Sequence, residues 1–249
     1  MDIAAVVFLA GSFGLFWWRH ARRSQRMLAA PRLAEDAEVA LHVAQHEAGT
    51  RGQWLTGLHV MRGLLQDDAF TAAIERLGGK VAPIEDRVLD ELDKTQIVAP
   101  DEAALRQTIG TAIAIAEHQG RLATCTDIWA YLARTPAGQL VASGGVEPAA
   151  LLFTLVHGFP EPTELPAVPH VDLVLRNDDY TTQEVVVAIL NDVFGLATAD
   201  AEARMLAAHQ QGSAVLGRFT VGEARDKLAA VRERVRARPY PLRIDAEPR

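Results

Sequence analysis

Hydrogen-bond acceptors of several kinds gather in two short stretches of the 249-residue sequence. Asn177, Asp178, Asp179 and Thr181 follow one another closely, and His209 comes later in the chain. An amide carbonyl, two carboxylates and a ring nitrogen suit a compact cation with several N–H donors, such as an ammonium group. His209 accepts a hydrogen bond only in its neutral form, so we expect binding at this site to weaken in acid.

Short strands and amphipathic helices must position these acceptors. Val171–Leu175 alternates as a strand and ends next to Asn177, and a helix over Gln183–Phe194 follows. In a second helix over Ala199–Gln211, Met205 and His209 lie four residues apart and share one face. The other elements expected here are a strand within 212–217, a helix over Val221–Arg236 and a final strand near Tyr240–Ile244.

Other chemistry finds little support in the sequence. An Asp-Asp pair is usually a solvated turn or a helix cap, and no nucleophile or metal-ligand set accompanies this one. The single cysteine, Cys125, excludes a disulfide framework and is expected to pack in the interior. A net charge of −7 argues against a nucleic-acid partner. We therefore expect a protein that is not an enzyme and that has neither a cofactor nor a metal.

The last third of the chain carries motifs that resemble the ClpS adaptor family. They read V-L-x-N-D-D-Y-T, M-L-x-x-H-x-x-G and G-x-F-T, with Pro241-Leu242 near the end, and the match spans 171–249. The resemblance implies a small α+β domain with a three-stranded antiparallel sheet. It also implies an adaptor that binds proteins by a bulky hydrophobic N-terminal residue, an N-degron. Such adaptors deliver their substrates to a Clp AAA+ unfoldase of the ClpA or ClpC type, which works with the ClpP protease.

The resemblance also assigns roles to residues. Asn177 and His209 contact the substrate's amino group, Asp179 acts through water or by its field, and Asp178 and Thr181 complete the site. Gln183 stands where the family often has an apolar residue, commonly Met, and Ala208 is smaller than the usual Val, so we expect altered or broadened specificity. Lys227 and Glu223 are the candidates for unfoldase docking. The hydrophobic pocket comprises Leu175, Gln183, Val186, Met205, Ala208 and Leu242.

The middle of the chain repeats itself at an offset of 68 residues, and each half reads as four helices. Thr56 and Thr124 occupy N-cap positions, and Thr124 with Asp127 has the spacing of a capping box. This all-α double repeat over 36–158 resembles the Clp amino-terminal domain, which receives substrates and adaptors at the front of the unfoldases. Clp amino-terminal domains bind ClpS adaptors in trans, so the two modules of this chain are expected to be able to dock in cis.

No ATPase follows the repeat, so the chain cannot unfold substrates by itself. An alternative function therefore stays open. The protein would then be a scaffold or regulator that sequesters an unfoldase or an adaptor through its repeat, without delivering substrates.

The first 26 residues are expected to form a membrane anchor. Residues 3–18 carry no charge and end in Trp17-Trp18, and four arginines follow directly. A cleaved signal peptide is the competing interpretation, but the early positive charge and the cleavage site are missing. The arginines predict a single-pass inner-membrane protein with cytoplasmic domains, and a cytoplasmic protein is the alternative. A Pro-rich linker over 159–170 separates the repeat from the adaptor-like domain at 171–249.

Overall fold

The structure is a computed structural model that describes residues 33–94 and 102–248. The chain divides into two compact units, one formed by the described parts of 1–68 and 85–132 and the other by 69–84 and 133–248. The second unit thus includes part of the helical region as well as the C-terminal domain. This division differs from the boundary expected at residue 158, which stays a prediction.

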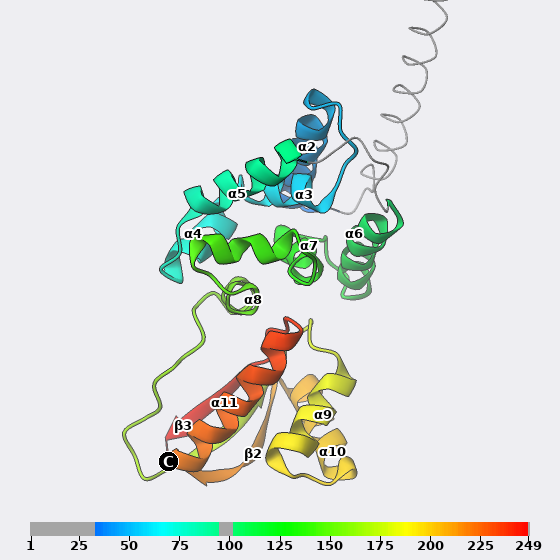
Figure 1. The fold of residues 1–249 in the computed structure, drawn as a ribbon. Coiled ribbons are helices and arrows are strands. Elements are labelled where there is room, and N and C mark those ends of the chain that lie inside the picture. The colour runs from blue at the N-terminus through cyan, green and yellow to red at the C-terminus, as the bar shows by residue number, and fades with distance from the viewer. Residues whose placement is uncertain (1–32, 95–101, 249) are drawn as a thin grey trace, which may run out of the picture. The chain divides into compact units, whose positions relative to one another are not determined.

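The helical region contains two successive sets of four elements (Figure 1). In the second set the third element, η1, is a 3₁₀ helix and not an α-helix. The identification of the whole helical region as a Clp amino-terminal double repeat stays a prediction. The bounds are α2 Glu35–Thr50, α3 Gly57–Leu64, α4 Asp68–Arg76, α5 Val81–Lys94, α6 Glu102–His118, α7 Cys125–Leu132, η1 Gly138–Gly144 and α8 Pro148–His157.

Two helix starts in the first unit use the same local geometry. At α3, Nδ1 of His59 accepts from the N–H of Thr56 at 3.1 Å and lies 2.8 Å from its hydroxyl. At α7, Oδ2 of Asp127 accepts from the N–H and the hydroxyl of Thr124 at 2.8 and 2.9 Å. These contacts confirm both predicted N-caps, because the side chain three residues on satisfies the free amide of the capping residue.

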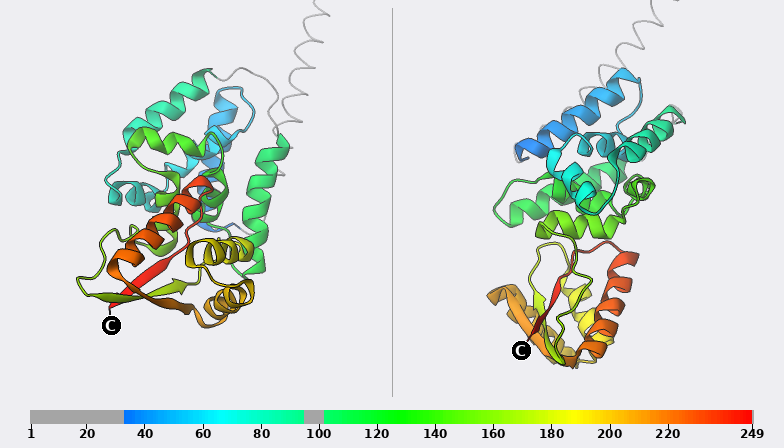
Figure 2. Two further views of the ribbon diagram at one scale, coloured as in Figure 1. Left: turned by 60° about the horizontal axis from the view of Figure 1, so that its bottom comes forward. Right: turned by 90° about the vertical axis from the view of Figure 1, so that its left-hand side faces the viewer.

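The C-terminal domain is built on a three-stranded antiparallel sheet in the order β2-β1-β3. The inward residues of β1, Val171, Leu173 and Leu175, join an apolar core with α9, α10 and α11. Figure 1 shows these three helices beside the strands, and Figure 2 shows the same elements from two further sides. These elements agree with a ClpS-like α+β domain. The bounds are β1 His170–Arg176, α9 Gln183–Phe194, α10 Thr198–Gln211, β2 Ser213–Thr220, α11 Val221–Ala237 and β3 Ile244–Pro248.

The expected position of the final strand is wrong. β3 begins at Ile244, where the expected strand ends, and 239–243 form no regular structure. Pro239 and Pro241 explain the difference, because proline has no N–H to donate to a neighbouring strand. Tyr240 and Leu242 are nevertheless buried, and both belong to the apolar core.

The helices of the described residues are short for a membrane span. No single helix there is long and apolar enough to cross a bilayer, and only the pair η1 and α8, bent by 95°, meets the criterion together. The anchor predicted at residues 3–18 lies outside the described residues.

His59 is fully buried and neutral in the first unit. Its Nδ1 accepts from a backbone N–H, so the ring proton lies on Nε2, which is 3.2 Å from Oε1 of Gln53. Burial lowers the pKa of His59 from 6.5 to about 4. Between these two values the unfolded chain binds more protons than the folded chain, so the free energy of unfolding falls as the pH falls through this window.

We expect the first unit to lose about 2 kcal/mol of stability between pH 7 and pH 5, and His59→Gln to remove most of this dependence. Urea unfolding followed by tryptophan fluorescence measures it, because Trp54 and Trp129 lie in this unit and no tryptophan follows them. The exposed His42 provides the matched control. An unchanged pH dependence in His59→Gln, equal to that of His42→Gln, would contradict the assignment.

Candidate functional site

A small cavity of about 40 Å³ lies where β1 ends, beside the starts of the loop and helix that follow. Ten of the eleven residues predicted for the binding site line it, and Asp179 is not among the described residues that do so. Arg176 lines the cavity as well and was not predicted. The lining residues are Leu175, Arg176, Asn177, Asp178, Thr181, Gln183, Val186, Met205, Ala208, His209 and Leu242.

The inner wall of the cavity is apolar. Leu175, Val186, Ala208 and Leu242 are all at least nine-tenths buried and come from β1, α9, α10 and the segment before β3. Gln183, the first residue of α9, is exposed.

The polar end of the cavity is formed by Asn177 and His209. Nδ1 of His209 lies 3.3 Å from Oδ1 of Asn177. The backbone N–H of Asn177 donates to the carbonyl of Gly212 at 3.0 Å, which fixes the loop to the end of α10. When Nδ1 of His209 carries the proton and donates to Asn177, Nε2 keeps a lone pair for an external donor. Both side chains are exposed at this end, so an incoming group can reach them.

Asp178 holds the loop between β1 and α9. Its Oδ1 accepts from the N–H of Tyr180 at 2.9 Å and from the N–H of Thr181 at 2.6 Å. Burial raises the pKa of Asp178, and the two amide hydrogen bonds offset only part of this rise. Asp178 thus holds the loop through the two hydrogen bonds that its Oδ1 accepts.

Arg176 and the two docking candidates have partners within the domain. Arg176 forms ion pairs with Asp245, at 2.8 Å, and with Glu247. Nζ of Lys227 donates to the carbonyl of Val193 at 2.9 Å, and Glu223 caps α11 through Thr220. Lys227 and Glu223 therefore support the fold, and their role in unfoldase docking stays a prediction. The position of Arg176 directly before Asn177 was the available signal for its place at the cavity.

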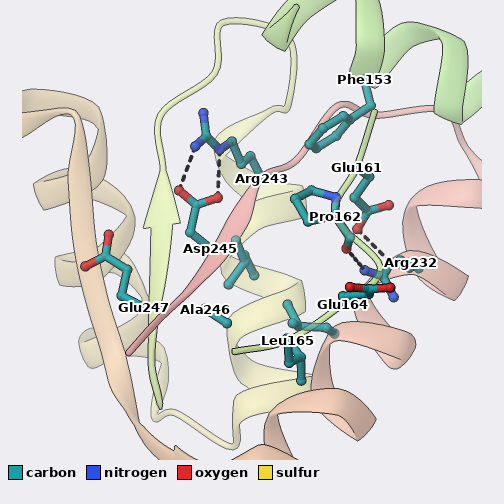
Figure 3. A pocket seen from close by; sticks show the side chains of 12 residues that line it. Phe153, Glu161, Pro162, Glu164, Leu165, Arg232, Arg243, Asp245, Ala246 and Glu247 are labelled. Carbon is teal, nitrogen blue, oxygen red and sulfur yellow. Dashed lines mark hydrogen bonds and ion pairs between the residues drawn. The ribbon is translucent and has the colours of Figure 1, made fainter. Parts of the chain in front are cut away.

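A larger cavity of about 290 Å³ lies beside the linker, α11 and β3 (Figure 3). Four of its charged wall residues form two ion pairs with one another. Nε of Arg232 lies 2.7 Å from Oε1 of Glu161, and Nε of Arg243 lies 2.8 Å from Oδ1 of Asp245. These groups have less to offer a charged ligand than the open acceptors at Asn177 and His209.

In the first unit, Asp36, Asp67 and Cys125 each place one potential ligand atom within 4.8 Å of the others. Burial, followed by the charges of Asp36 and Asp67, raises the pKa of the Cys125 thiol. A protonated thiol is a poor metal ligand. Asp36 instead accepts the N–H of Cys125 at 2.9 Å, so the set is explained by packing at the start of α7.

Comparisons with known proteins agree on the C-terminal domain. The family model "ATP-dependent Clp protease adaptor protein ClpS" matches residues 167–245. The ClpS adapter protein of Oleidesulfovibrio alaskensis is 41% identical over 75 residues, which cover 30% of this chain and 72% of that protein. The protein of the same name from Acetivibrio thermocellus is 43% identical over 76 residues, 30% of this chain and 77% of that protein.

A solved structure, Agrobacterium tumefaciens ClpS2 bound to L-phenylalaninamide, is 30% identical and covers 32% of this chain and 98% of that chain, with a TM-score of 0.31.

The role of Asp178 can be tested with two substitutions. Asp178→Ala removes the acceptor of two loop amides, so we expect faster hydrogen exchange at Tyr180 and Thr181 and a loss of about 1 kcal/mol of stability. Asp178→Asn keeps an oxygen acceptor, so we expect it to retain most of the protection. Amide exchange measured by NMR distinguishes the two variants. Equal protection of both amides in Asp178→Ala and the unchanged chain would show that the carboxylate does not hold the loop.

Proposed function

The chain belongs to the ClpS adaptor family of the Clp protease system, and on that premise we propose that its C-terminal domain binds proteins by a bulky hydrophobic N-terminal residue. ClpS adaptors are non-catalytic regulators, which agrees with the expectation that the protein is not an enzyme. The bound protein is then delivered to a ClpA-type or ClpC-type unfoldase and its ClpP protease.

The observation that carries this proposal is that one cavity is lined both by a buried apolar wall and by two exposed hydrogen-bond acceptors, Asn177 and His209. A free N-terminus combines an apolar side chain with an ammonium group that has three donors. Asn177 and His209, 3.3 Å apart, present oxygen and nitrogen acceptors to the ammonium group. Leu175 and Leu242 present the apolar wall to the side chain. The negative charge of Asp179 on the same loop adds a favourable field for the cation.

The selectivity of the proposed site depends on Gln183. Its side chain is exposed and lines the cavity, so it contacts a substrate side chain that enters. The amide of Gln183 adds little to the burial of the substrate's first side chain. The amide also loses its hydrogen bonds to water when that side chain covers it. We therefore propose a broadened specificity among bulky first residues.

The anchor and the alternative function belong to the same proposal. We propose, from the sequence of residues 3–18, a single membrane span that leaves the adaptor domain in the cytoplasm. A tethered adaptor would collect substrates at the membrane surface. The scaffold or regulator would be favoured if the C-terminal domain showed no preference for a bulky first residue.

The central prediction concerns the acceptor pair. We expect Asn177→Ala and His209→Ala each to raise the Kd for a Phe-initiated peptide at least tenfold, because a hydrogen bond to a charged group contributes about 1.5–3 kcal/mol. Isothermal titration calorimetry on the full chain measures this. Gln210→Ala is the matched control, since Gln210 is the exposed neighbour of His209 on α10.

Acetylation of the peptide's N-terminus is expected to abolish binding. If the acetylated peptide bound as tightly as the free one, recognition of the amino group would be ruled out.

A second prediction concerns the side chain at position 183, which lines the cavity. We expect Gln183→Met to lower the Kd for Phe-initiated and Leu-initiated peptides a few-fold, since an apolar cover buries more of the bound side chain. The competition ratio between Phe-initiated and Val-initiated peptides is expected to rise. Gln210→Met, which adds the same side chain outside the cavity, serves as the control. An unchanged competition ratio in Gln183→Met would show that residue 183 does not set the selectivity for the first side chain.

A further inference from the structure

The segment that carries Leu242 into the cavity has few hydrogen bonds of its own. Residues 239–243 connect α11 with β3 and form neither helix nor strand. Pro239 and Pro241 lack an N–H, so they cannot secure this segment to a strand. At its far end the carbonyl of Arg243 accepts from the N–H of Arg176 at 2.9 Å. The wall of the cavity at Leu242 therefore needs support from elsewhere in the unit.

Two residues from the helical part of the second unit supply this support. Nε2 of His157, the last residue of α8, lies 2.7 Å from the carbonyl oxygen of Pro241. Nη2 of Arg134 donates to the carbonyl of Pro239 at 3.2 Å, and its guanidinium lies 4.6 Å from the centre of the Tyr240 ring. The two carbonyls that flank Tyr240 and precede Leu242 are thus both bonded from upstream residues.

His157 is itself held in a defined orientation. A carbonyl only accepts, so the ring proton lies on Nε2. The imidazole packs on Phe153, with ring centres 4.4 Å apart, and Phe153 is buried. Gly158, with φ +80°, ends α8 directly after His157 in a conformation that favours glycine.

The linker fixes the same region from the other side. Arg232 on α11 pairs with Glu161 at 2.7 Å and donates to the carbonyl of Pro162 at 2.6 Å (Figure 3). The guanidinium of Arg243 lies 4.9 Å from the centre of the Phe159 ring. In contrast, the ion pair between Arg236 and Glu147 is more than half exposed and contributes little. The half-buried contacts around His157 therefore matter more than the surface pair.

We infer that His157 and Arg134 act as positioning residues that hold the 239–243 segment, so that the apolar wall at Leu242 depends on the upstream helical segment. This inference rests on the proposed function of the cavity. Its consequence is that the preference for an N-terminal side chain is a property of the joined segments of the second unit and not of residues 171–249 alone. Neither residue lines the cavity itself.

The test uses the full chain and three variants. His157→Ala removes the donor to Pro241, His157→Gln keeps an N–H donor, and His170→Ala changes an exposed histidine at the start of β1. The Kd for a Phe-initiated peptide is expected to rise about fivefold in His157→Ala, which is about 1 kcal/mol at 25 °C. His157→Gln is expected to restore it to within twofold, and His170→Ala to leave it unchanged.

A second readout is independent of the peptide. The methyl NMR signals of Leu242 are expected to shift and broaden in His157→Ala, and to remain close to those of the unchanged chain in His157→Gln. If the unchanged chain bound no Phe-initiated peptide, the proposed function would fail, while the Leu242 signals would still report on the contact. If the unchanged chain bound and His157→Ala bound equally well, with unshifted Leu242 signals, the positioning role would be overturned.

Discussion

The pairing of β1 with both of its neighbours is the constraint on which the C-terminal domain depends. Side chains alternate along a strand, so this register places Val171, Leu173 and Leu175 in the core together. A slip of one residue would turn all three away from α9, α10 and α11. The same register ends the strand directly before Asn177 and brings Leu175 to the cavity. Core packing and site geometry therefore follow from one set of backbone hydrogen bonds.

Features set by local sequence could be predicted. The helix over Gln183–Phe194 has the predicted bounds, and the spacing of Met205 and His209 places both at the cavity. The capping threonines could be found because each acts on residues within one helical turn. The predicted start of β3 was wrong because Pro241, inside the expected strand Tyr240–Ile244, and Pro239, just before it, have no N–H to donate to a neighbouring strand.

Contacts between residues far apart in the chain could not be predicted from the sequence. His157 and Pro241 are 84 residues apart, and Arg134 and Pro239 are 105 residues apart. A carbonyl oxygen is present at every residue, so nothing in the sequence marks Pro239 or Pro241 as an acceptor for a particular side chain. The ion pairs of Arg176 with Asp245 and Glu247 could not be predicted for a related reason, since they require the position of β3.

The two capped helices of the first unit satisfy the N–H of the capping threonine with side chains in different charge states. His59 must stay neutral to accept from Thr56, whereas Asp127 accepts from Thr124 as a carboxylate and forms an ion pair with Arg121 at 2.6 Å. Burial alone would raise the pKa of Asp127, but the bonds from Arg121 and Thr124 outweigh it and lower the pKa. The contribution of Asp127 to the free energy of unfolding is therefore present above pH 4 and is lost in stronger acid. This loss occurs below the pH range in which His59 affects stability. The first unit is thus weakened by acid in two successive steps.

The few contacts that His157 and Arg134 make with the 239–243 segment are effective because they are intramolecular. A separate partner would have to overcome the loss of translational and rotational freedom before two hydrogen bonds and one stacked guanidinium had any effect. Within one chain the same contacts form at a high effective concentration. The linker contacts of Arg232 raise it further, since they restrict the path between α8 and α11. A weak contact can then decide the position of Leu242, and through it the shape of the apolar wall.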